Sequence, residues 1–118
     1  MEHECATDEI FVFGSNLAGR HGKGAAKTAR QDYGAKWGQG FGFSGRSFAI
    51  PTKDFELKPL PLKDIEVFVD MFIFSAGCYP ESKYFLTRIG CGLAGYKDED
   101  IAPMFKDAPA NVRKPPGW

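Results

Sequence analysis

Two glycine-rich segments, each beginning where an apolar run stops, constrain this chain more than any other feature of its sequence. The first, Gly14–Ala26, follows the β-branched and aromatic run Ile10–Phe13, and the second, Gly90–Tyr96, follows Tyr84–Ile89. Short apolar runs bounded by glycine are typical of buried strands. A strand that turns through glycines into a helix presents unpaired backbone N–H groups and the positive end of the helix dipole at one place. The sequence therefore predicts two anion-binding turns.

The rest of the chain continues this alternation of strands and helices. Residues compatible with a helix occupy Ala25–Tyr33, and Ser47–Ile50 is a further apolar run. The clearest helix follows Pro61, where apolar residues recur every three or four positions, at Ile65, Phe68, Val69, Phe72, Ile73 and Ala76. A short helix is expected over Asp98–Phe105. This order favours an α/β fold with a mostly parallel sheet, in which ligands lie at the carboxyl ends of the strands.

Length and charge predict one domain over residues 1–118 and exclude two classes of partner. A chain of 118 residues can bury a real core. Its 15 basic residues equal its 15 acidic ones, so it lacks the positive field on which non-specific nucleic-acid binding depends. The apolar stretches are too short for a bilayer, and Met1–Ile10 is acidic and without a signal core. We therefore expect a cytoplasmic protein that does not bind membranes.

The sequence indicates no metal and no cofactor. The three cysteines, Cys5, Cys78 and Cys91, have no CxxC spacing, and we interpret Cys78 and Cys91 as small buried side chains. The acidic run Asp98–Asp100 is explained by the preference for negative charge at a helix start.

Two glycine patterns match known nucleotide motifs only in part. Gly14–Gly19 has the glycine spacing of a P-loop, but Arg20 and His21 stand where the lysine and hydroxyl residue belong. Gly40–Gly45 spells GxGxxG, yet it leads into a strand rather than a helix. We expect the aromatic residues of that loop to pack over the core or over a base.

Several polar residues fall at the predicted carboxyl ends of the strands, and their roles are open at this stage. Asn16 either binds ribose hydroxyls or caps its own turn. Lys53 is either a nucleophile with a lowered pKa or an ordinary surface lysine. The glycines bind phosphate or simply make a tight turn. The polar residues on this rim are Ser15, Asn16, Arg20, His21, Lys23, Thr52, Lys53 and Asp54.

Three motifs resemble the macrodomain superfamily of ADP-ribose-binding modules, and in particular the branch of the terminal ADP-ribose glutamate hydrolases. RHGKGAA at Arg20–Ala26 is similar to the RMGAGIA loop of that branch. AIPTK at Ala49–Lys53 is similar to its strand ending in Ile-Thr-Lys. RIGCGL at Arg88–Leu93 is the most specific match, and the likeness spans most of Ile10–Phe105.

The resemblance implies a three-layer α/β/α fold that holds ADP-ribose across the rim, with the diphosphate between the two glycine-rich loops and no cofactor. It also implies Lys53 as the catalytic nucleophile. The residues expected at the ligand are Ser15, Asn16, Arg20, His21, Gly22, Lys23, Gly24, Ala25, Thr52, Gly90, Cys91, Gly92, Leu93, Ala94, Gly95 and Tyr96.

Two departures from the family pattern decide the expected function. The catalytic aspartate of that branch is replaced by Ala94, with Asp54 and Asp98 as the acids that could substitute for it. Only nine residues precede Ile10, where many macrodomains carry an acid that reads adenine. We therefore expect a binder of ADP-ribose or a related NAD-derived nucleotide. The alternatives are an ADP-ribosyl hydrolase using Lys53, and a structural or interaction domain that has lost the ligand.

Overall fold

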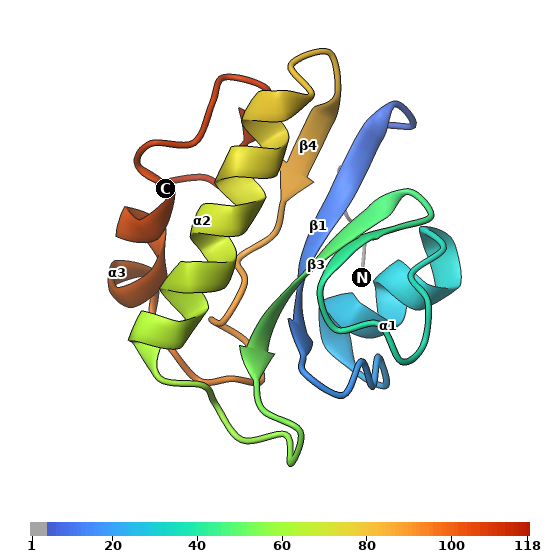
Figure 1. The fold of residues 1–118 in the computed structure, drawn as a ribbon, viewed down its shortest axis with the longest axis vertical. Coiled ribbons are helices and arrows are strands. Elements are labelled where there is room, and N and C mark those ends of the chain that lie inside the picture. Colours follow the sequence, from blue (N-terminus) through green and yellow to red (C-terminus); the bar gives the residue numbers. More distant parts are fainter. Residues whose placement is uncertain (1–4) are drawn as a thin grey trace.

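Strand β1 (Glu9–Asn16) is the centre of a five-stranded mixed sheet, seen here in a computed structural model that describes residues 5–118 (Figure 1). Its neighbours are β3 (Ser47–Lys53) and β4 (Lys83–Leu86), and both pair with β1 in parallel. The order across the sheet is β2-β3-β1-β4-β5. The predicted α/β class is therefore confirmed, and the three strands at the centre end at the same edge of the sheet.

The two edge strands were not predicted from the sequence. Strand β2 (Gly42–Ser44) runs antiparallel to β3, inside the segment that we expected to be a loop. Strand β5 (Val112–Arg113) runs parallel to β4. Each is only two or three residues long, which is too short for an alternating pattern to stand out.

The central strands begin and end at different residues from those predicted. Strand β1 continues past Phe13 to Asn16, so three of the expected loop residues belong to the sheet. Strand β4 stops at Leu86, three residues before the predicted end. At its end the backbone N–H and the hydroxyl of Thr87 both donate to the carbonyl of Val12, at 3.1 and 2.7 Å, which makes this the last ladder contact between β4 and β1.

Helices α1 (Gly24–Asp32) and α2 (Leu62–Cys78) lie on either side of β1 and β3 (Figure 1). Alternate residues of a strand point to opposite faces. Phe11 and Phe13 accordingly pack with Ala26 and Ala29 of α1, whereas Val12 belongs to the cluster that includes the buried residues of α2. Helix α3 (Asp98–Ile101) and the 3₁₀ turn Ala102–Phe105 follow β4. Within residues 5–118 no helix combines the length and apolar character needed to cross a membrane.

Phe72 is the centre of the aromatic core on the α2 side of the sheet. Its ring lies 5.0 Å from that of Phe48, 5.4 Å from that of Tyr84 and 6.4 Å from that of Phe105. Trp118 packs against Phe105 with the rings 5.7 Å apart. Trp118 thus covers part of this core.

The helix predicted after Pro61 has the expected core face and an unexpected outer face. Its buried residues are Ile65, Val69, Phe72 and Ala76, with Phe68 and Ile73 partly buried. The prediction that Cys78 is buried is wrong: α2 runs on through Gly77, and Cys78 lies exposed at its end. Cys91, the other cysteine expected in the core, is only partly buried.

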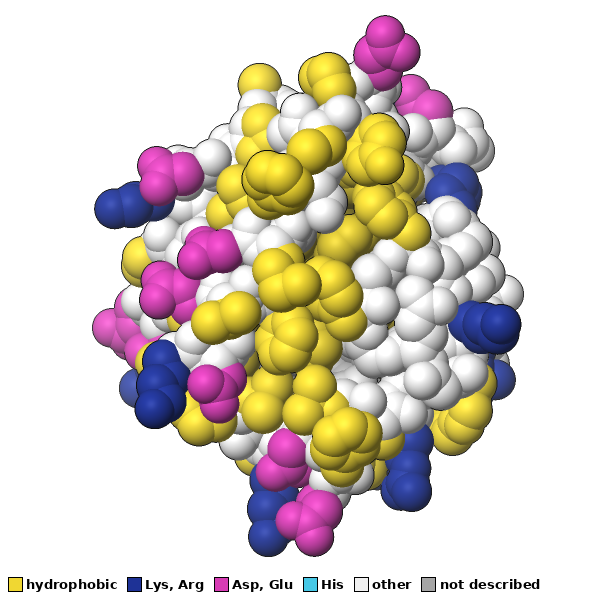
Figure 2. All heavy atoms as spheres, viewed as in Figure 1, with side chains coloured by type: hydrophobic (Ala, Val, Ile, Leu, Met, Phe, Trp, Pro, Cys, Tyr) yellow, Lys and Arg dark blue, Asp and Glu magenta, His cyan; other side chains and the backbone are white. Residues whose placement is uncertain are grey.

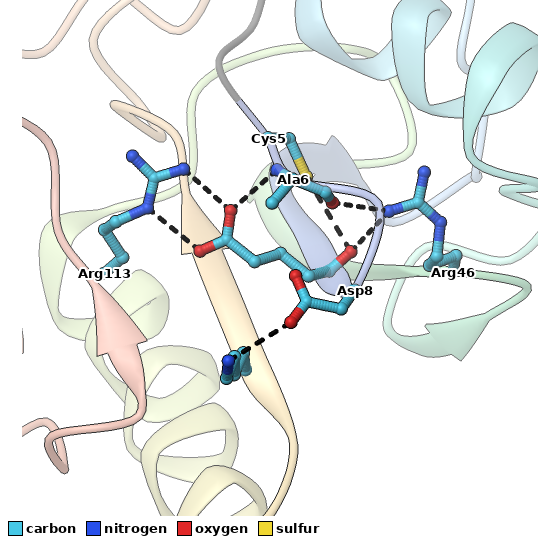
Figure 3. A network of polar contacts seen from close by, with 7 residues as sticks. Cys5, Ala6, Asp8, Arg46 and Arg113 are labelled. Carbon is cyan, nitrogen blue, oxygen red and sulfur yellow. Dashed lines mark hydrogen bonds and ion pairs between the residues drawn. The ribbon is translucent and has the colours of Figure 1, made fainter.

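A polar network fixes the amino end of β1, far from the glycine-rich loops (Figure 3). The carboxylate of Glu9 accepts two hydrogen bonds from the Arg113 guanidinium, at 2.7 and 2.9 Å, and one from the amide of Ala6 at 2.8 Å. Arg46 donates to the carbonyls of Glu9 and Ala6. The Arg113 hydrogen bonds hold the pKa of Glu9 below its usual value. The network ties the start of β1 to β5 and to the hairpin of β2 and β3.

Candidate functional site

Gly14 marks the point where the predicted rim residues come together. A Cβ at this position would lie 3.5 Å from the amide nitrogen of Gly90 and 3.5 Å from the hydroxyl oxygen of Thr52. β1 therefore passes directly between the end of β3 and the start of the second glycine-rich loop. The parallel pairing that the sequence predicted is what brings both loops to one edge.

Asn16 shapes the first glycine-rich loop instead of pointing to a ligand. Its side-chain oxygen accepts from the amide of Arg20 at 2.9 Å, and its side-chain nitrogen donates to the carbonyl of Arg20 at 2.9 Å. Of the two roles left open for Asn16, the structure shows the turn cap. Gly19 is also structural, since its φ is +70° and a Cβ there would overlap Gly38 and Gln39.

Ser15 and His21 form a buried pair beneath this loop. The hydroxyl of Ser15 lies 3.1 Å from Nε2 of His21, and His21 has no exposed surface. The imidazole stands edge-on to Phe13, 5.2 Å between centroids, and Trp37 lies on another side at 6.4 Å. The carbonyl of His21 accepts from the guanidinium of Arg30 at 3.0 Å, which ties the loop to α1. These contacts make both residues part of the support of the loop.

Burial lowers the pKa of His21 below its usual value of 6.5. The backbone of Gln39 partly offsets this effect by favouring the protonated ring, and the nearby positive charge of Arg30 adds a smaller lowering. His21 is therefore neutral in the folded protein at neutral pH. Protonation would place a positive charge in a fully buried ring.

The open part of the first loop is its passage into α1. The amides of Gly22 and Lys23 have no hydrogen-bond partner among residues 5–118, and a Cβ at Gly22 would meet no atom within 4 Å. The amides in the first turn of a helix are also unpaired. No side chain caps this end of α1 and its first turn holds no acidic residue. The result is a set of free donors at the positive end of a nine-residue helix.

The second loop, Gly90–Tyr96, is closed by its own backbone. The amide of Tyr96 donates to the carbonyl of Gly90 at 2.9 Å, and that of Gly95 to the carbonyl of Gly92 at 3.0 Å. The amides of Gly92 and Leu93 have no partner within the described part of the chain, and a Cβ at Gly92 would meet open space. The tip of the loop thus presents free donors, while its base is held together.

The two loops lie next to each other at the rim. A Cβ on Gly24, the first residue of α1, would lie 3.8 Å from a methyl carbon of Leu93. The segment with the unpaired amides of Gly22 and Lys23 therefore lies beside the segment with those of Gly92 and Leu93. Unpaired backbone N–H groups in such loops can bind oxyanions without adding net charge.

One ion pair and two hydrogen bonds around the second loop fix its position. Arg88, just before the loop, forms an ion pair with Asp98, just after it, at 2.8 Å, and also donates to the carbonyl of Pro116 at 2.6 Å. Tyr96 donates its hydroxyl hydrogen to the carbonyl of Leu60 at 2.6 Å. The Arg88–Asp98 pair was not predicted from the sequence, because the position of Asp98 at the start of a helix already explains its charge. The pair could have been inferred from the opposite charges that stand on the two sides of the glycine-rich segment.

Cys91 is not a reactive thiol in this arrangement. Burial, with a hydrogen bond to Asp98 and the negative charge of that residue, raises the pKa of the Cys91 thiol to about 11. The nucleophile in cysteine chemistry is the thiolate. A neutral Cys91 leaves the backbone of this loop, rather than its side chain, as the feature available for chemistry.

Lys53, the candidate nucleophile, lies at the rim, and the two acids proposed to assist it are held by other groups. Lys53 pairs with Asn16 at the end of β3 and is partly buried, while Ala94 is buried. The carboxylate of Asp54 accepts from the amides of Glu56 and Lys58, which makes it the cap of its own turn. The carboxylate of Asp98 is paired with Arg88. Neither acid proposed as a substitute is presented to Lys53 by these contacts.

The predicted site residues divide by burial into those that support the rim and those that are open to a ligand. The supporting residues are Ser15, Asn16, His21, Thr52, Gly90 and Ala94, all buried. The partly buried ones are Ala25, Lys53, Cys91 and Tyr96, and the exposed ones are Arg20, Gly22, Lys23, Gly24, Gly92, Leu93 and Gly95.

The buried imidazole predicts a loss of stability in mild acid. Above about pH 6.5 His21 is neutral in both states; below it the unfolded chain binds a proton that the folded protein does not, so the free energy of unfolding falls, with a slope approaching about 1.4 kcal/mol per pH unit. The loss continues until the pH reaches the lowered pKa of the folded state. Denaturant unfolding between about pH 5 and 6.5 measures this slope, above the range in which Glu9 titrates.

The variant His21→Gln, which still carries His3, is the control for this experiment. It is expected to be less stable at every pH and to show a flatter slope across the same window. A wild-type free energy of unfolding that stays constant over the window, or equal slopes for the two proteins, would contradict a buried neutral His21.

Comparison of the chain with models of protein families, with curated proteins and with solved structures finds no match. The resemblance to macrodomains therefore rests on the three quoted motifs, and the case for a function rests on the geometry of the rim.

Proposed function

We propose that this protein binds ADP-ribose or a related NAD-derived nucleotide, with the diphosphate held between the two glycine-rich loops. The observation that carries the proposal is the pair of neighbouring loops whose amides at Gly22, Lys23, Gly92 and Leu93 lack partners in the described chain. One loop could bind a single phosphate. Two neighbouring loops suit two linked phosphates, because each phosphate then has donors of its own.

The charges around the rim support an anionic ligand. Arg20 and Lys23 are exposed on the first loop, and Lys53 lies at the end of β3. The acids nearest in sequence, Asp54 and Asp98, are engaged by backbone amides and by Arg88. A protein with no net charge thus offers local positive potential at this edge. The proposal includes a macrodomain-like three-layer arrangement, with α1 and α2 as the outer layers.

Binding is favoured over hydrolysis because the two acids that could serve Lys53 in proton transfer, Asp54 and Asp98, are held by other partners in the described structure. A lysine attacking an anomeric carbon needs a neighbouring group to move protons. Ala94 supplies none, and both candidate substitutes have other partners. The alternative of a hydrolase therefore has a nucleophile candidate in Lys53 and no completed catalytic pair.

Valine at Gly22 or at Gly92 should remove binding and leave the fold intact. Both glycines lie outside the left-handed region and a Cβ at either would meet no atom within 4 Å, so the larger side chain fits the folded protein. It would occupy the space that the phosphates need. Calorimetry with ADP-ribose, NAD and AMP is expected to show ADP-ribose affinity falling at least about 10-fold in each variant, the equivalent of about one lost hydrogen bond to a charged group.

Gly77→Val is the matched control. A Cβ at Gly77 also meets open space, and α2 ends near the edge of the sheet that is opposite to the edge with the loops. It should bind as the wild type does. The absence of detectable heat with any of the diphosphate nucleotides would overturn the proposal and favour a domain that has lost its ligand. Unchanged affinity in both loop variants would show that the nucleotide binds at another site.

The rate at which ADP-ribose is released from an ADP-ribosylated protein separates binding from hydrolysis. We expect the wild type and Lys53→Ala to give the same background rate, because no acid assists Lys53. A wild-type rate well above that of Lys53→Ala would establish a hydrolase and show that some other group supplies the proton.

A further inference from the structure

Helix α2 carries apolar residues on its outer face, where a surface helix is normally polar. Val67, Met71 and Phe74 follow one another at intervals of four and three, which places them on one face. Their exposed fractions are 56%, 45% and 74%. The helix therefore has an apolar face without a partner in addition to its core face.

The apolar face continues onto the β2 edge of the sheet. Phe41 packs on Phe68 of α2 with the rings 5.5 Å apart, and Phe43 lies 6.0 Å from Tyr79, just beyond the helix. We call the six residues Phe41, Phe43, Val67, Met71, Phe74 and Tyr79 the apolar strip. Figure 2 shows hydrophobic side chains in a nearly continuous band down this face of the molecule.

The strip has the area that a stable dimer needs. An aromatic side chain buries about 150–250 Å² in full, so the exposed parts of the strip amount to on the order of 500 Å². A standard interface covers about 800 Å² on each partner, and homodimer interfaces are about 65% apolar. The apolar share of such an interface is therefore about what the strip exposes.

The shape of the strip is suited to another copy of itself. A hollow of about 320 Å³ lies along it, lined by Phe41, Asp70, Met71, Phe74 and Ser75. Phe74, the most exposed large apolar residue, stands at the edge of this hollow. A two-fold axis places the same surface on both partners, so the ring of each copy can enter the hollow of the other. Asp70 lines the same hollow and is exposed, so its carboxylate can stay in contact with water while the ring packs on Phe41 and Met71.

The charge of the chain does not oppose self-association. A net charge far from zero keeps proteins apart in solution. Here the 15 basic and 15 acidic residues cancel, so two copies meet no long-range repulsion at neutral pH.

We propose that the protein forms a two-fold symmetric homodimer through the apolar strip, with α2 of each copy at the centre. The proposal does not rest on nucleotide binding. The surface it uses is the outer face of α2 and the β2 edge, separate from the two glycine-rich loops.

Sedimentation velocity over a range of concentrations, on the wild type and Phe74→Glu, tests this dimer. The wild type is expected to sediment as a dimer at micromolar concentration, as standard-sized interfaces commonly do. Phe74→Glu should weaken the dimer at least about 100-fold, because it buries an uncompensated charge twice in a two-fold interface. Phe74 is so exposed that the monomer should fold normally, which its circular dichroism spectrum checks.

Phe55→Glu is the matched control, since Phe55 is 66% exposed in the loop before α2 and is not part of the strip. It should associate as the wild type does. A wild type that remains monomeric at the highest concentrations would overturn the proposal and indicate that the apolar strip binds a different protein. A dimer unaffected by Phe74→Glu would overturn it as well, because the interface would then lie elsewhere.

Discussion

The parallel pairing of β1 with both of its neighbours is the constraint on which the candidate site depends. Because β3 and β4 run in the same direction as β1, the segments that follow these strands emerge at one edge. The end of β3 and the start of the second loop come close together at Gly14, which lies between Thr52 and Gly90. An antiparallel neighbour would have sent one of the loops to the opposite edge. The polar network around Glu9 holds β1 at its other end (Figure 3).

Several buried side chains of the rim support its backbone. Asn16 caps the turn at Arg20, Ser15 holds His21, and the hydroxyl of Thr52 donates to the carbonyl of Ser15 at 3.2 Å. Within the described residues the amides of Gly22, Lys23, Gly92 and Leu93 lack partners, and the side chains of Arg20 and Lys23 are exposed beside them. Backbone amides suit phosphate oxygens, and this is the mode of recognition that we propose.

The α/β class, the three central strands and the position of the two loops at one edge of the sheet could be predicted from the sequence, because these features follow from local patterns. Apolar runs that end in glycine marked the strands, and the alternation with helices marked their parallel order. The burial of His21 could not be predicted in this way. It depends on Phe13 and Trp37, which approach from different parts of the chain, whereas a histidine in a glycine-rich loop usually faces water. The apolar outer face of α2 was not predicted either. The core residues of this helix form a complete pattern by themselves, and Val67, Met71 and Phe74 lie outside that pattern.

We propose that amides from both glycine-rich loops bind one diphosphate, and amide-resolved NMR during a titration with ADP-ribose is the sharpest test of this proposal. The resonances of Gly22, Lys23, Gly92 and Leu93 should shift together, with one saturation curve, while that of Gly77 stays in place. Shifts confined to one loop, separate saturation curves for the two loops, or no shift at either would contradict it.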